Sequence, residues 1–360
     1  MKKVYQLFDC DIFLADKIVA EKFFTDFLNG LNPSQVFILT DSNTRKYCLP
    51  LLLKAYPLLN KAVVLEIQAG ESSKSQLAYE EIINALLDNH AERDSLLINL
   101  GGGVVCDLGG FIAGVYKRGI RFINMPTTLM AMADAAIGGK TAVNFDNIKN
   151  AIGLFNMPES IFVFTEFLNT LDARQINNGL AEIIKMAFLF GGPNFELIKR
   201  FVPADELPVT DILVESIQQK CRIVESDYLD KGARKLLNFG HTLGHALELI
   251  DHNSKGNLLH GEAIVQGMLF AAYLSRKKTG LSASSLILMK KILYFYFSKA
   301  NSPKPSFNTV YTVLLNDKKN KLNTIQFVLL EKLGKSASMY ECKDFEFKIN
   351  WKNFTKPKRI

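Results

Sequence analysis

The stretch Leu96-Leu97-Ile98-Asn99-Leu100-Gly101-Gly102-Gly103-Val104-Val105 decides the fold, because a short apolar run passes directly into three glycines and then into a helix-compatible sequence. Glycines after a strand let backbone amides approach a pyrophosphate group at the positive end of a helix macrodipole. The strict G-x-G-x-x-G pattern fails, because Cys106 stands where the third glycine belongs. The stretch therefore predicts a strand, a glycine turn and a helix, which either bind a dinucleotide or form an ordinary tight turn.

The flanking sequence places this unit in an α/β domain. Three further β-rich apolar runs alternate with helical stretches, and they span residues 35–40, 62–67 and 122–125. This alternation predicts a parallel, Rossmann-like sheet over residues 1–165. From about Phe167 the apolar positions recur three and four apart, which predicts a mainly α-helical domain over residues 166–342. Residues 343–360 are predicted to form a basic C-terminal tail.

Length and composition indicate a soluble protein of two domains. At 360 residues the chain exceeds the usual size of one domain, and 48% hydrophobic with 22% charged residues is a globular balance. Lys290 and Lys291 interrupt the best apolar stretch, so no membrane span is expected. The N-terminus lacks an apolar leader, and the five scattered cysteines indicate a reducing compartment, so we expect a cytoplasmic location.

The net charge of +7 is confined to one part of the sequence. Residues 317–360 contain eleven Lys or Arg and five Asp or Glu, so this segment carries six of the seven positive charges. It ends in Lys356-Pro357-Lys358-Arg359, without the interleaved aromatic residues of a nucleic-acid groove. We therefore expect a solvated tail and no nucleic-acid partner.

A cluster of histidines points to a metal site. Four of the five histidines lie between residues 241 and 260. His241 and His245 are four apart on an expected helix and share a face, so spacing alone pairs them on one metal, with His260 before the next helix. Glu182 lies in an apolar helix with Lys185 three residues later, so it either completes the metal site or forms a structural ion pair.

Polar residues elsewhere suggest sites for a ribose and for anions. Asp41, followed by Asn43, ends the run 35–40, where a carboxylate can bind a ribose or simply cap the next helix. Basic and amide side chains among glycines and apolar residues are typical phosphate or carboxylate ligands, although any one of them can be surface decoration. They are Lys140, Thr141, Lys149, Asn150, Lys220, Arg234 and Asn238. Together these features indicate the oxidation of an acidic, phosphorylated, polyhydroxylated substrate.

Seven ordered segments, spread over roughly residues 35–335, resemble the signatures of the 3-dehydroquinate synthase family. They are Gly101-Gly102-Gly103-Val104-Val105-Cys106-Asp107-Leu108, Tyr116-Lys117-Arg118-Gly119, Met125-Pro126-Thr127-Thr128-Leu129, Gly138-Gly139-Lys140-Thr141, Ala181-Glu182-Ile183-Ile184-Lys185, Asn238-Phe239-Gly240-His241-Thr242-Leu243-Gly244-His245 and Leu259-His260-Gly261-Glu262-Ala263. The resemblance implies a homodimeric lyase of the shikimate pathway that uses NAD+ and a divalent metal, Zn2+ or Co2+. Such an enzyme converts 3-deoxy-D-arabino-heptulosonate 7-phosphate to 3-dehydroquinate and phosphate by transient oxidation, phosphate elimination, re-reduction and aldol closure.

The same resemblance implies a role for each matching residue. The implied metal ligands are Glu182, His241 and His260, with His245 facing the substrate, which replaces the pairing suggested by spacing. The implied NAD residues are Asp41, Asn43, Glu71, Lys74, Gly101, Gly102, Gly103, Asp107, Thr127, Thr128, Lys140 and Lys149. The implied substrate residues are Asp134, Lys140, Asn150, Lys185, Lys220, Arg234, Asn238, His245 and Lys318, with Arg118 reaching across a dimer interface.

Departures from the family pattern leave these ligands in place. Ala135-Ala136, Asp230 and Met157 replace residues that are commonly Ser-Ser, Glu and Gln in the family. The nearest alternatives are a valiolone or inosose synthase, which share the expected NAD and metal sites, and a polyol dehydrogenase, which would release NADH. A third alternative is a binding protein with an inactive site, but the expected metal and substrate residues are all present, which argues against it.

Overall fold

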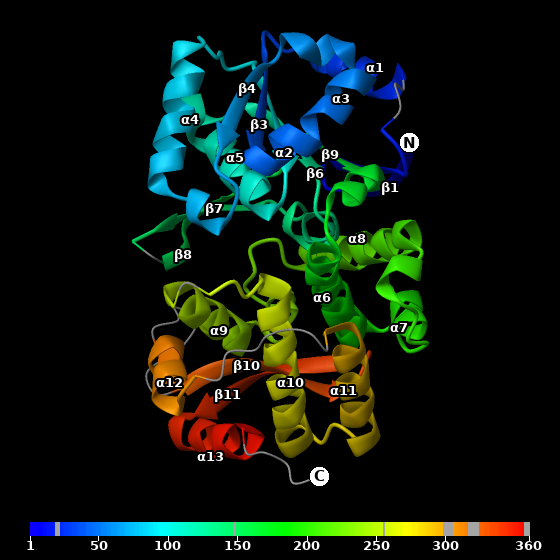
Figure 1. Ribbon diagram of the computed structural model, residues 1–360, viewed down its shortest axis with the longest axis vertical. Coiled ribbons are helices and arrows are strands. Elements are labelled where there is room, and N and C mark those ends of the chain that lie inside the picture. The colour runs from blue at the N-terminus through cyan, green and yellow to red at the C-terminus, as the bar shows by residue number, and fades with distance from the viewer. Residues whose placement is uncertain (19–21, 147, 255, 298–304, 316–323, 356–360) are drawn as a thin grey trace. The chain divides into compact units, whose positions relative to one another are not determined.

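The computed structural model describes residues 1–18, 22–146, 148–254, 256–297, 305–315 and 324–355. The chain forms two compact units (Figure 1). The first contains Met1–Ile176 and Pro208–Leu229, and the second contains Asn177–Leu207 and Asp230–Ile360. Helix α8 (Val209–Ser226) therefore belongs to the first unit, although the sequence places it in a helical second half. The domain limits after residues 165 and 342 stay predictions.

A mixed sheet forms the centre of the first unit. Among the described residues seven strands pair in the order β1-β2-β9-β6-β5-β3-β4. They are β1 (Lys2–Leu7), β2 (Cys10–Ala15), β3 (Val36–Asp41), β4 (Val63–Ile67), β5 (Leu96–Gly101), β6 (Arg121–Pro126) and β9 (Ser160–Phe164). All neighbours are parallel except β1 and β2. The predicted parallel sheet is confirmed, whereas the β1-β2 hairpin and the separate hairpin of β7 (Lys140–Phe145) and β8 (Ile148–Phe155) were not predicted.

The parallel strands are mostly apolar because helices cover both faces of the sheet. Figure 1 shows α4 (Gln76–Asp88) on one side of β3 and β4, with α1 (Lys22–Leu31) and α3 (Leu49–Ala55) on the other. On the α1 side, Phe24 packs against Tyr56 and Phe162, with ring centroids 4.5 and 5.0 Å away. Such burial of large side chains is the main favourable contribution to the free energy of folding.

Helix α5 (Gly103–Val115) lies unusually close to β5. A Cβ atom on Gly109 would sit 1.8 Å from Oδ1 of Asn99. Asn99 is buried and donates through Nδ2 to Oδ1 of Asn124 on β6, so it has no room to withdraw. Gly109 therefore allows the close packing of helix on strand that the third glycine of a G-x-G-x-x-G motif provides.

The order of strands reverses beside β3, which places a ligand site at one edge of the sheet. Strands β4 and β5 lie on opposite sides of β3. In open α/β sheets ligands bind beyond the carboxyl ends of the strands at such a switch point. Here β3 ends at Asp41 and β5 ends at Gly101, so the glycine turn and the predicted ribose ligand meet at this edge.

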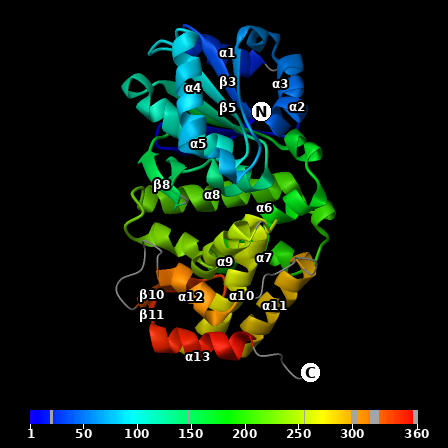
Figure 2. The ribbon, with the colours of Figure 1, turned by 60° about the vertical axis from the view of Figure 1, so that its left-hand side comes forward.

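The second unit is mainly helical, as predicted, but also contains a β hairpin. Its helices are α6 (Ala173–Phe190, whose first turn falls in the first unit), α7 (Pro193–Ile198), α9 (His241–Asn253), α10 (His260–Lys278), α11 (Ala283–Phe297), α12 (Phe307–Leu315) and α13 (Asp344–Thr355). The hairpin pairs β10 (Thr324–Lys332) with β11 (Ser336–Lys343). Figure 2 shows α13 beside this hairpin in the second unit. No described helix has both the length and the apolar character needed to cross a membrane.

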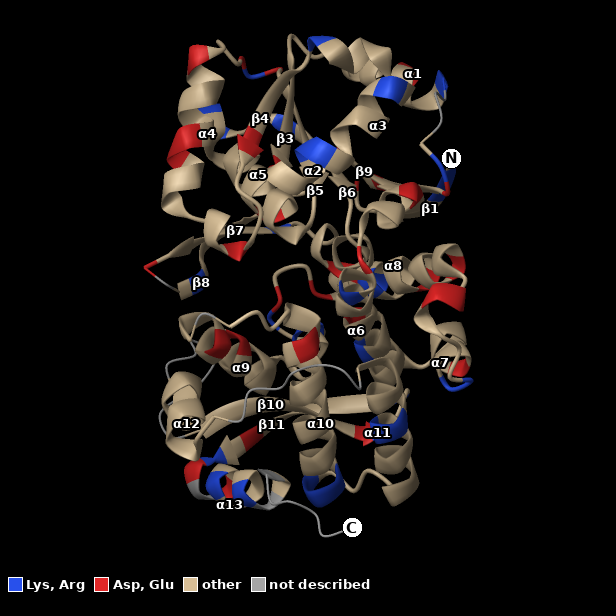
Figure 3. Cartoon of the chain, viewed as in Figure 1, with Lys and Arg blue, Asp and Glu red and all other residues tan. Residues whose placement is uncertain are grey.

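The prediction of a solvated tail is wrong for residues 344–355. In α13 the side chains of Phe347 and Trp351 are buried, and their ring centroids lie 5.7 and 6.0 Å from that of Phe270 on α10. The helix carries charges of both signs (Figure 3), and Nζ of Lys278 contacts Oε1 of Glu346 at 2.5 Å. The prediction failed because it rested on the net charge of the segment, which does not show that one face of the helix is apolar. The terminal basic residues 356–360 lie outside the described part of the chain.

Candidate functional site

A carboxylate and three imidazoles meet inside the second unit. Glu182 lies in the middle of α6, while His241 and His260 are the first residues of α9 and α10. Nε2 of His241 and of His260 lie 3.5 and 3.6 Å from Oε1 of Glu182. One ring nitrogen from each of His241, His245 and His260 lies within 4.8 Å of the corresponding nitrogens of the other two. Four potential metal ligands therefore come from three helices.

Close contact between α9 and α10 brings the first residues of these helices together. Gly240, before α9, has φ of 81°, and a Cβ atom there would lie 2.7 Å from Cγ of Met268. A Cβ atom on Gly267 would lie 1.8 Å from the carbonyl oxygen of Gly240. Helix α10 is also tied to α6, because Oδ1 of Asn178 accepts a hydrogen bond from the Gly261 amide at 2.6 Å.

The two oxygens of Glu182 have different surroundings. The side chain is 1% exposed, and Oε2 pairs with Nζ of Lys185. Oε1 makes no hydrogen bond within the described residues, and both imidazole nitrogens facing it are too distant for a good one. A buried carboxylate oxygen in this position is costly unless a cation is shared with the rings. Carboxylate and imidazole are ligands that divalent zinc and cobalt accept, so this donor set fits such an ion.

The protonation of the group agrees with this fit. Burial alone would raise the pKa of Glu182, but Lys185 and His260 outweigh it and hold the pKa at about 2. Burial would lower the pKa of His260, but the nearby carboxylates of Glu182 and Glu248 raise it to about 10. The site therefore attracts positive charge, and a metal ion would replace the imidazole proton because a ligating histidine is neutral.

Two acceptors behind the rings turn Nε2 of each histidine toward Glu182. Nδ1 of His260 lies 3.2 Å from Oε2 of Glu248, and Nδ1 of His241 lies 3.2 Å from the backbone oxygen of Phe239. Partners of this kind fix the tautomer of a metal-ligating histidine. Sequence analysis missed Glu248, although it lies seven residues after His241, which is the spacing of one helix face.

The residues predicted to bind the nucleotide lie in the first unit. Gly102 precedes α5 without any side-chain cap, so the first amides of that helix face the glycine turn. The amide of Thr127, after β6, donates to the carbonyl of Gly101 at 3.0 Å. The hydroxyl of Thr127 is buried and has no hydrogen-bond partner within the described residues. A glycine turn at a helix N-terminus with this hydroxyl beside it fits a pyrophosphate group.

Asp41 is a helix cap, the second of the two roles considered from sequence. Its Oδ1 accepts from the Thr44 amide at 2.8 Å, and Oγ1 of Thr44 accepts from the Asp41 amide at 2.9 Å. This capping box begins α2 (Ser42–Tyr47), on which Asn43 is exposed. Capping uses one carboxylate oxygen, so a ribose contact stays a prediction.

A buried lysine connects several predicted ligands of the first unit. Nζ of Lys74 donates to Oδ2 of Asp107 and to Oδ1 of Asn150, both at 2.5 Å. Burial raises the pKa of Asp107, and the charge of Lys74 opposes that rise. Asn144, which sequence analysis does not select, donates through Nδ2 to Oε1 of Glu71 at 3.0 Å. The predicted residues Glu71, Lys74, Asp107 and Asn150 therefore belong to one hydrogen-bonded group.

The remaining predicted substrate residues are distributed over both units. In the first, Nζ of Lys220 on α8 contacts Oδ1 of Asp134 at 2.5 Å. In the second, Arg234 is 2% exposed within the helical turn Ala233–Asn238, and Nδ2 of Asn238 donates to the Lys235 carbonyl. Lys140, Asn150 and Arg118 are exposed, Lys149 and Thr128 are half-buried, and Lys318 lies outside the described residues.

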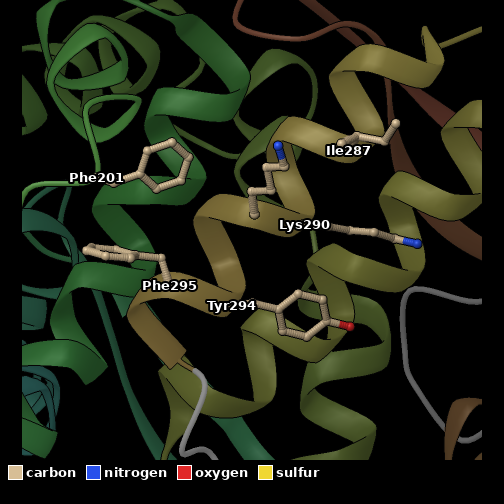
Figure 4. A pocket seen from close by; sticks show the side chains of 6 residues that line it. Phe201, Ile287, Lys290, Tyr294 and Phe295 are labelled. Atoms are coloured by element: carbon tan, nitrogen blue, oxygen red, sulfur yellow. The ribbon is translucent and has the colours of Figure 1, made fainter. Parts of the chain in front are cut away.

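A separate hollow lies on the surface of the second unit (Figure 4). It encloses about 540 Å³ and is lined by Phe201, Ile287, Lys290, Lys291, Tyr294 and Phe295. No predicted site residue lines it, so the hollow is not the predicted site.

Known proteins match the chain over nearly its whole length. Residues 64–178 match the family "3-dehydroquinate synthase N-terminal", and residues 179–320 match "3-dehydroquinate synthase C-terminal". The 3-dehydroquinate synthase of Parabacteroides distasonis is 40% identical over 311 residues, covering 86% of this chain and 88% of that protein.

Solved structures share the fold at lower identity. The 2-deoxy-scyllo-inosose synthase complexed with carbaglucose-6-phosphate, NAD+ and Co2+ has a TM-score of 0.84 and 23% identity, covering 94% of this chain and 95% of that one. The 2-epi-5-epi-valiolone synthase of Streptomyces hygroscopicus subsp. jinggangensis, with NAD+ and Zn2+ bound, has a TM-score of 0.83 and 24% identity, covering 96% of each chain. With both family regions matched and a relative of 40% identity, the chain belongs to the 3-dehydroquinate synthase family.

Proposed function

We propose that this chain is a 3-dehydroquinate synthase, a phosphate-eliminating lyase of the shikimate pathway. It converts 3-deoxy-D-arabino-heptulosonate 7-phosphate to 3-dehydroquinate and phosphate with NAD+ and a divalent ion, Zn2+ or Co2+. The observation that carries the proposal is the family match over residues 64–320, which includes Glu182, His241 and His260. The buried Glu182 oxygen that faces two imidazoles supports the metal part of the proposal.

The residues of the second unit are proposed to bind the ion and the acidic end of the substrate. A bound divalent ion supplies polarisation of the substrate hydroxyl groups, and bound NAD+ supplies reversible removal of hydride from C5. Glu182, His241 and His260 hold the ion, with Lys185 fixing the carboxylate of Glu182. Arg234 is suited to the substrate carboxylate, because a planar guanidinium donates two parallel hydrogen bonds. His245 and Asn238 are assigned to the substrate hydroxyl groups.

The residues of the first unit are proposed to hold NAD and to orient the phosphate-bearing substrate. The amides at the start of α5 bind the pyrophosphate, and Asp41, Glu71 and Thr127 take neighbouring polar groups of the nucleotide. Further contacts are assigned to Asn43, Lys74, Gly101, Gly102, Gly103, Asp107, Thr128, Lys140 and Lys149. Asp134, Asn150 and Lys220 act on the substrate, where fixed charges favour elimination by holding the leaving phosphate in one orientation.

The proposed assembly is a homodimer in which Arg118 reaches the partner's site. Lys117, Arg118 and Gly119 have φ of 48°, 67° and 120°, so two exposed cationic residues adopt the left-handed region in succession. Non-glycine residues in this region cost about 1 to 3 kcal/mol each and are concentrated at functional sites. A cytoplasmic location is also proposed, because all five cysteines are buried free thiols.

Phosphate release tests the proposed reaction. The full-length protein, supplied with NAD+ and Zn2+, should release phosphate from the heptulosonate phosphate, and prior chelation should abolish the release. A neutral sugar phosphate serves as the comparison, because an inosose or valiolone synthase would prefer a substrate without the carboxylate. If the protein turns over only the neutral sugar phosphate, it is an inosose or valiolone synthase. This class is the main alternative because the fold is similar to that of both synthases.

A further inference from the structure

Asn144 links two segments of the first unit that the proposed function assigns to different ligands. Its backbone amide donates to the carbonyl of Lys74 at 2.8 Å, and its Nδ2 donates to Oε1 of Glu71 at 3.0 Å. Its Oδ1 accepts from the Asn150 amide at 2.8 Å. One half-buried side chain on β7 therefore contacts both the turn at residues 71–74 and strand β8.

The chemistry of the neighbours fixes the orientation of the Asn144 carboxamide. A carboxylate only accepts hydrogen bonds, so Nδ2 must face Glu71. A backbone amide only donates, so Oδ1 must face Asn150. Reversal of the carboxamide would lose both bonds and place two oxygens against each other, so Asn144 occupies one orientation.

The same logic fixes the side chain of Asn150. An ammonium group only donates, so Oδ1 of Asn150 faces Nζ of Lys74, which is 3% exposed. Asn150 has φ of 51°, a strained value for a residue inside a strand. The bond from Asn144 to the Asn150 amide acts at this strained residue, where the backbone depends most on its partners.

We propose that Asn144 is a positioning residue that holds the NAD-binding turn at Glu71 and Lys74 and the substrate-binding Asn150 in one arrangement. The inference rests on the proposed function, which supplies the roles of those three residues. Through Nδ2, Asn144 orients a carboxylate for the nucleotide. Through Oδ1, it holds the backbone from which the Asn150 carboxamide reaches the substrate.

Two substitutions separate the two bonds. Asn144→Ala removes both side-chain bonds and leaves the backbone bond to Lys74. Asn144→Asp keeps an acceptor for the Asn150 amide but places a second carboxylate against Glu71. Asn60, which is exposed in the same unit, provides the matched control Asn60→Ala.

The test measures three quantities on the full-length protein with Zn2+. They are the Kd of NAD+, the KM of the heptulosonate phosphate at saturating NAD+, and hydrogen exchange at the Asn150 amide. Asn144→Ala should raise both Kd and KM about tenfold and speed the exchange, since bonds to charged or strained partners have effects of this order. Asn144→Asp should raise the Kd of NAD+ similarly while KM and exchange stay within about twofold of the wild type. Asn60→Ala should change none of them.

A purely structural role predicts a different pattern. If Asn144→Asp and Asn144→Ala shift Kd, KM and exchange equally, Asn144 stabilises the unit without separate effects on the two ligands, and the inference is overturned. It is also overturned if Asn144→Ala speeds the exchange but leaves Kd and KM unchanged. Failure of the wild type to bind NAD+ or release phosphate would instead overturn the proposed function, and this inference with it.

Discussion

At the scale of single residues, Glu182 shows how a buried charge is maintained by its neighbours. Removing a carboxylate from water is costly, and an unpaired one would be neutralised. Here Lys185 takes one oxygen and two imidazoles face the other. Each group is needed to hold the charge of the others, so single substitutions should act on the whole cluster.

Metal content should separate the proposed ligand His260 from its supporting residue Glu248. We expect His260→Ala to lose the ion, because a site with three protein ligands has no spare coordination. Glu248→Gln should retain it with affinity reduced about 10- to 100-fold, the usual effect of losing an outer-shell partner. Competition with a chelator, followed by elemental analysis, measures both. The exposed His252→Ala is the control, and full zinc content in His260→Ala would contradict the assignment.

Arg234 should not tolerate a conservative change. Arg234→Lys keeps the charge but loses the paired hydrogen bonds, so we expect a loss of roughly 2 to 4 kcal/mol in transition-state stabilisation, measured as kcat/KM. NAD and metal affinity should persist. Lys235→Arg, at an exposed neighbour, is the control. A change below about threefold would mean that Arg234 serves only in an ion pair such as one with Asp230.

Asp41 has a helix-capping role that must be separated from nucleotide binding. Asn caps helices about as well as Asp, so Asp41→Asn should leave the thermal midpoint unchanged. If the carboxylate binds a ribose, the same variant should weaken the binding of NAD+ by about 1 kcal/mol, because a charged hydrogen bond becomes a neutral one. Titration calorimetry gives the Kd. An unchanged Kd, with Asp41→Ala less stable, would leave Asp41 as a cap alone.

At the scale of elements, helix α13 gains its stability from an aromatic cluster. Phe347 is fully buried, while Ile349 on the same helix is 57% exposed. This difference in exposure shows that only one face of the helix packs against the unit, although the segment is largely polar and charged in sequence.

This contrast gives a matched pair of substitutions. Phe347→Ala should destabilise the second unit by about 3 to 5 kcal/mol, the usual cost of emptying a buried phenylalanine site. Ile349→Ala should change stability by less than about 0.5 kcal/mol. The chain has one tryptophan, Trp351, which lies on α13, so its fluorescence in urea reports the helix directly. Equal midpoints for the two variants would show that α13 is not anchored through Phe347.

At the scale of the whole molecule, the proposed reaction leaves no redox change. Hydride removed from C5 is returned before release, so phosphate should accumulate without reduced nicotinamide. Simultaneous phosphate assay and nicotinamide absorbance check this. Stoichiometric NADH would indicate a dehydrogenase.

The sequence predicted those features that depend on local patterns. Strands 35–40, 62–67, 96–100 and 122–125 were found because parallel strands buried on both faces are continuous apolar runs. Sequence analysis does not predict the β7-β8 hairpin, because Lys140, Asn144 and Asn150 interrupt the apolar runs of its two strands. Helical periodicity places Glu248 on one face with His241, but it does not reveal the contact of Glu248 with His260 on the next helix. The contacts of Asn144 with Glu71 and Lys74 join segments that are distant in the sequence, so no local pattern reveals them.

The return of α8 to the first unit has a consequence for synthesis on the ribosome. The Tyr5 hydroxyl donates a hydrogen bond to Glu225 on α8, and Asp134 forms an ion pair with Lys220 on α8. The first unit therefore includes a helix that is synthesised after residues 177–207, which belong to the second unit. The nascent chain must start the second unit before it completes the first. No single cut of the gene separates the two, and a fragment ending at Ile176 would expose the surface that α8 covers.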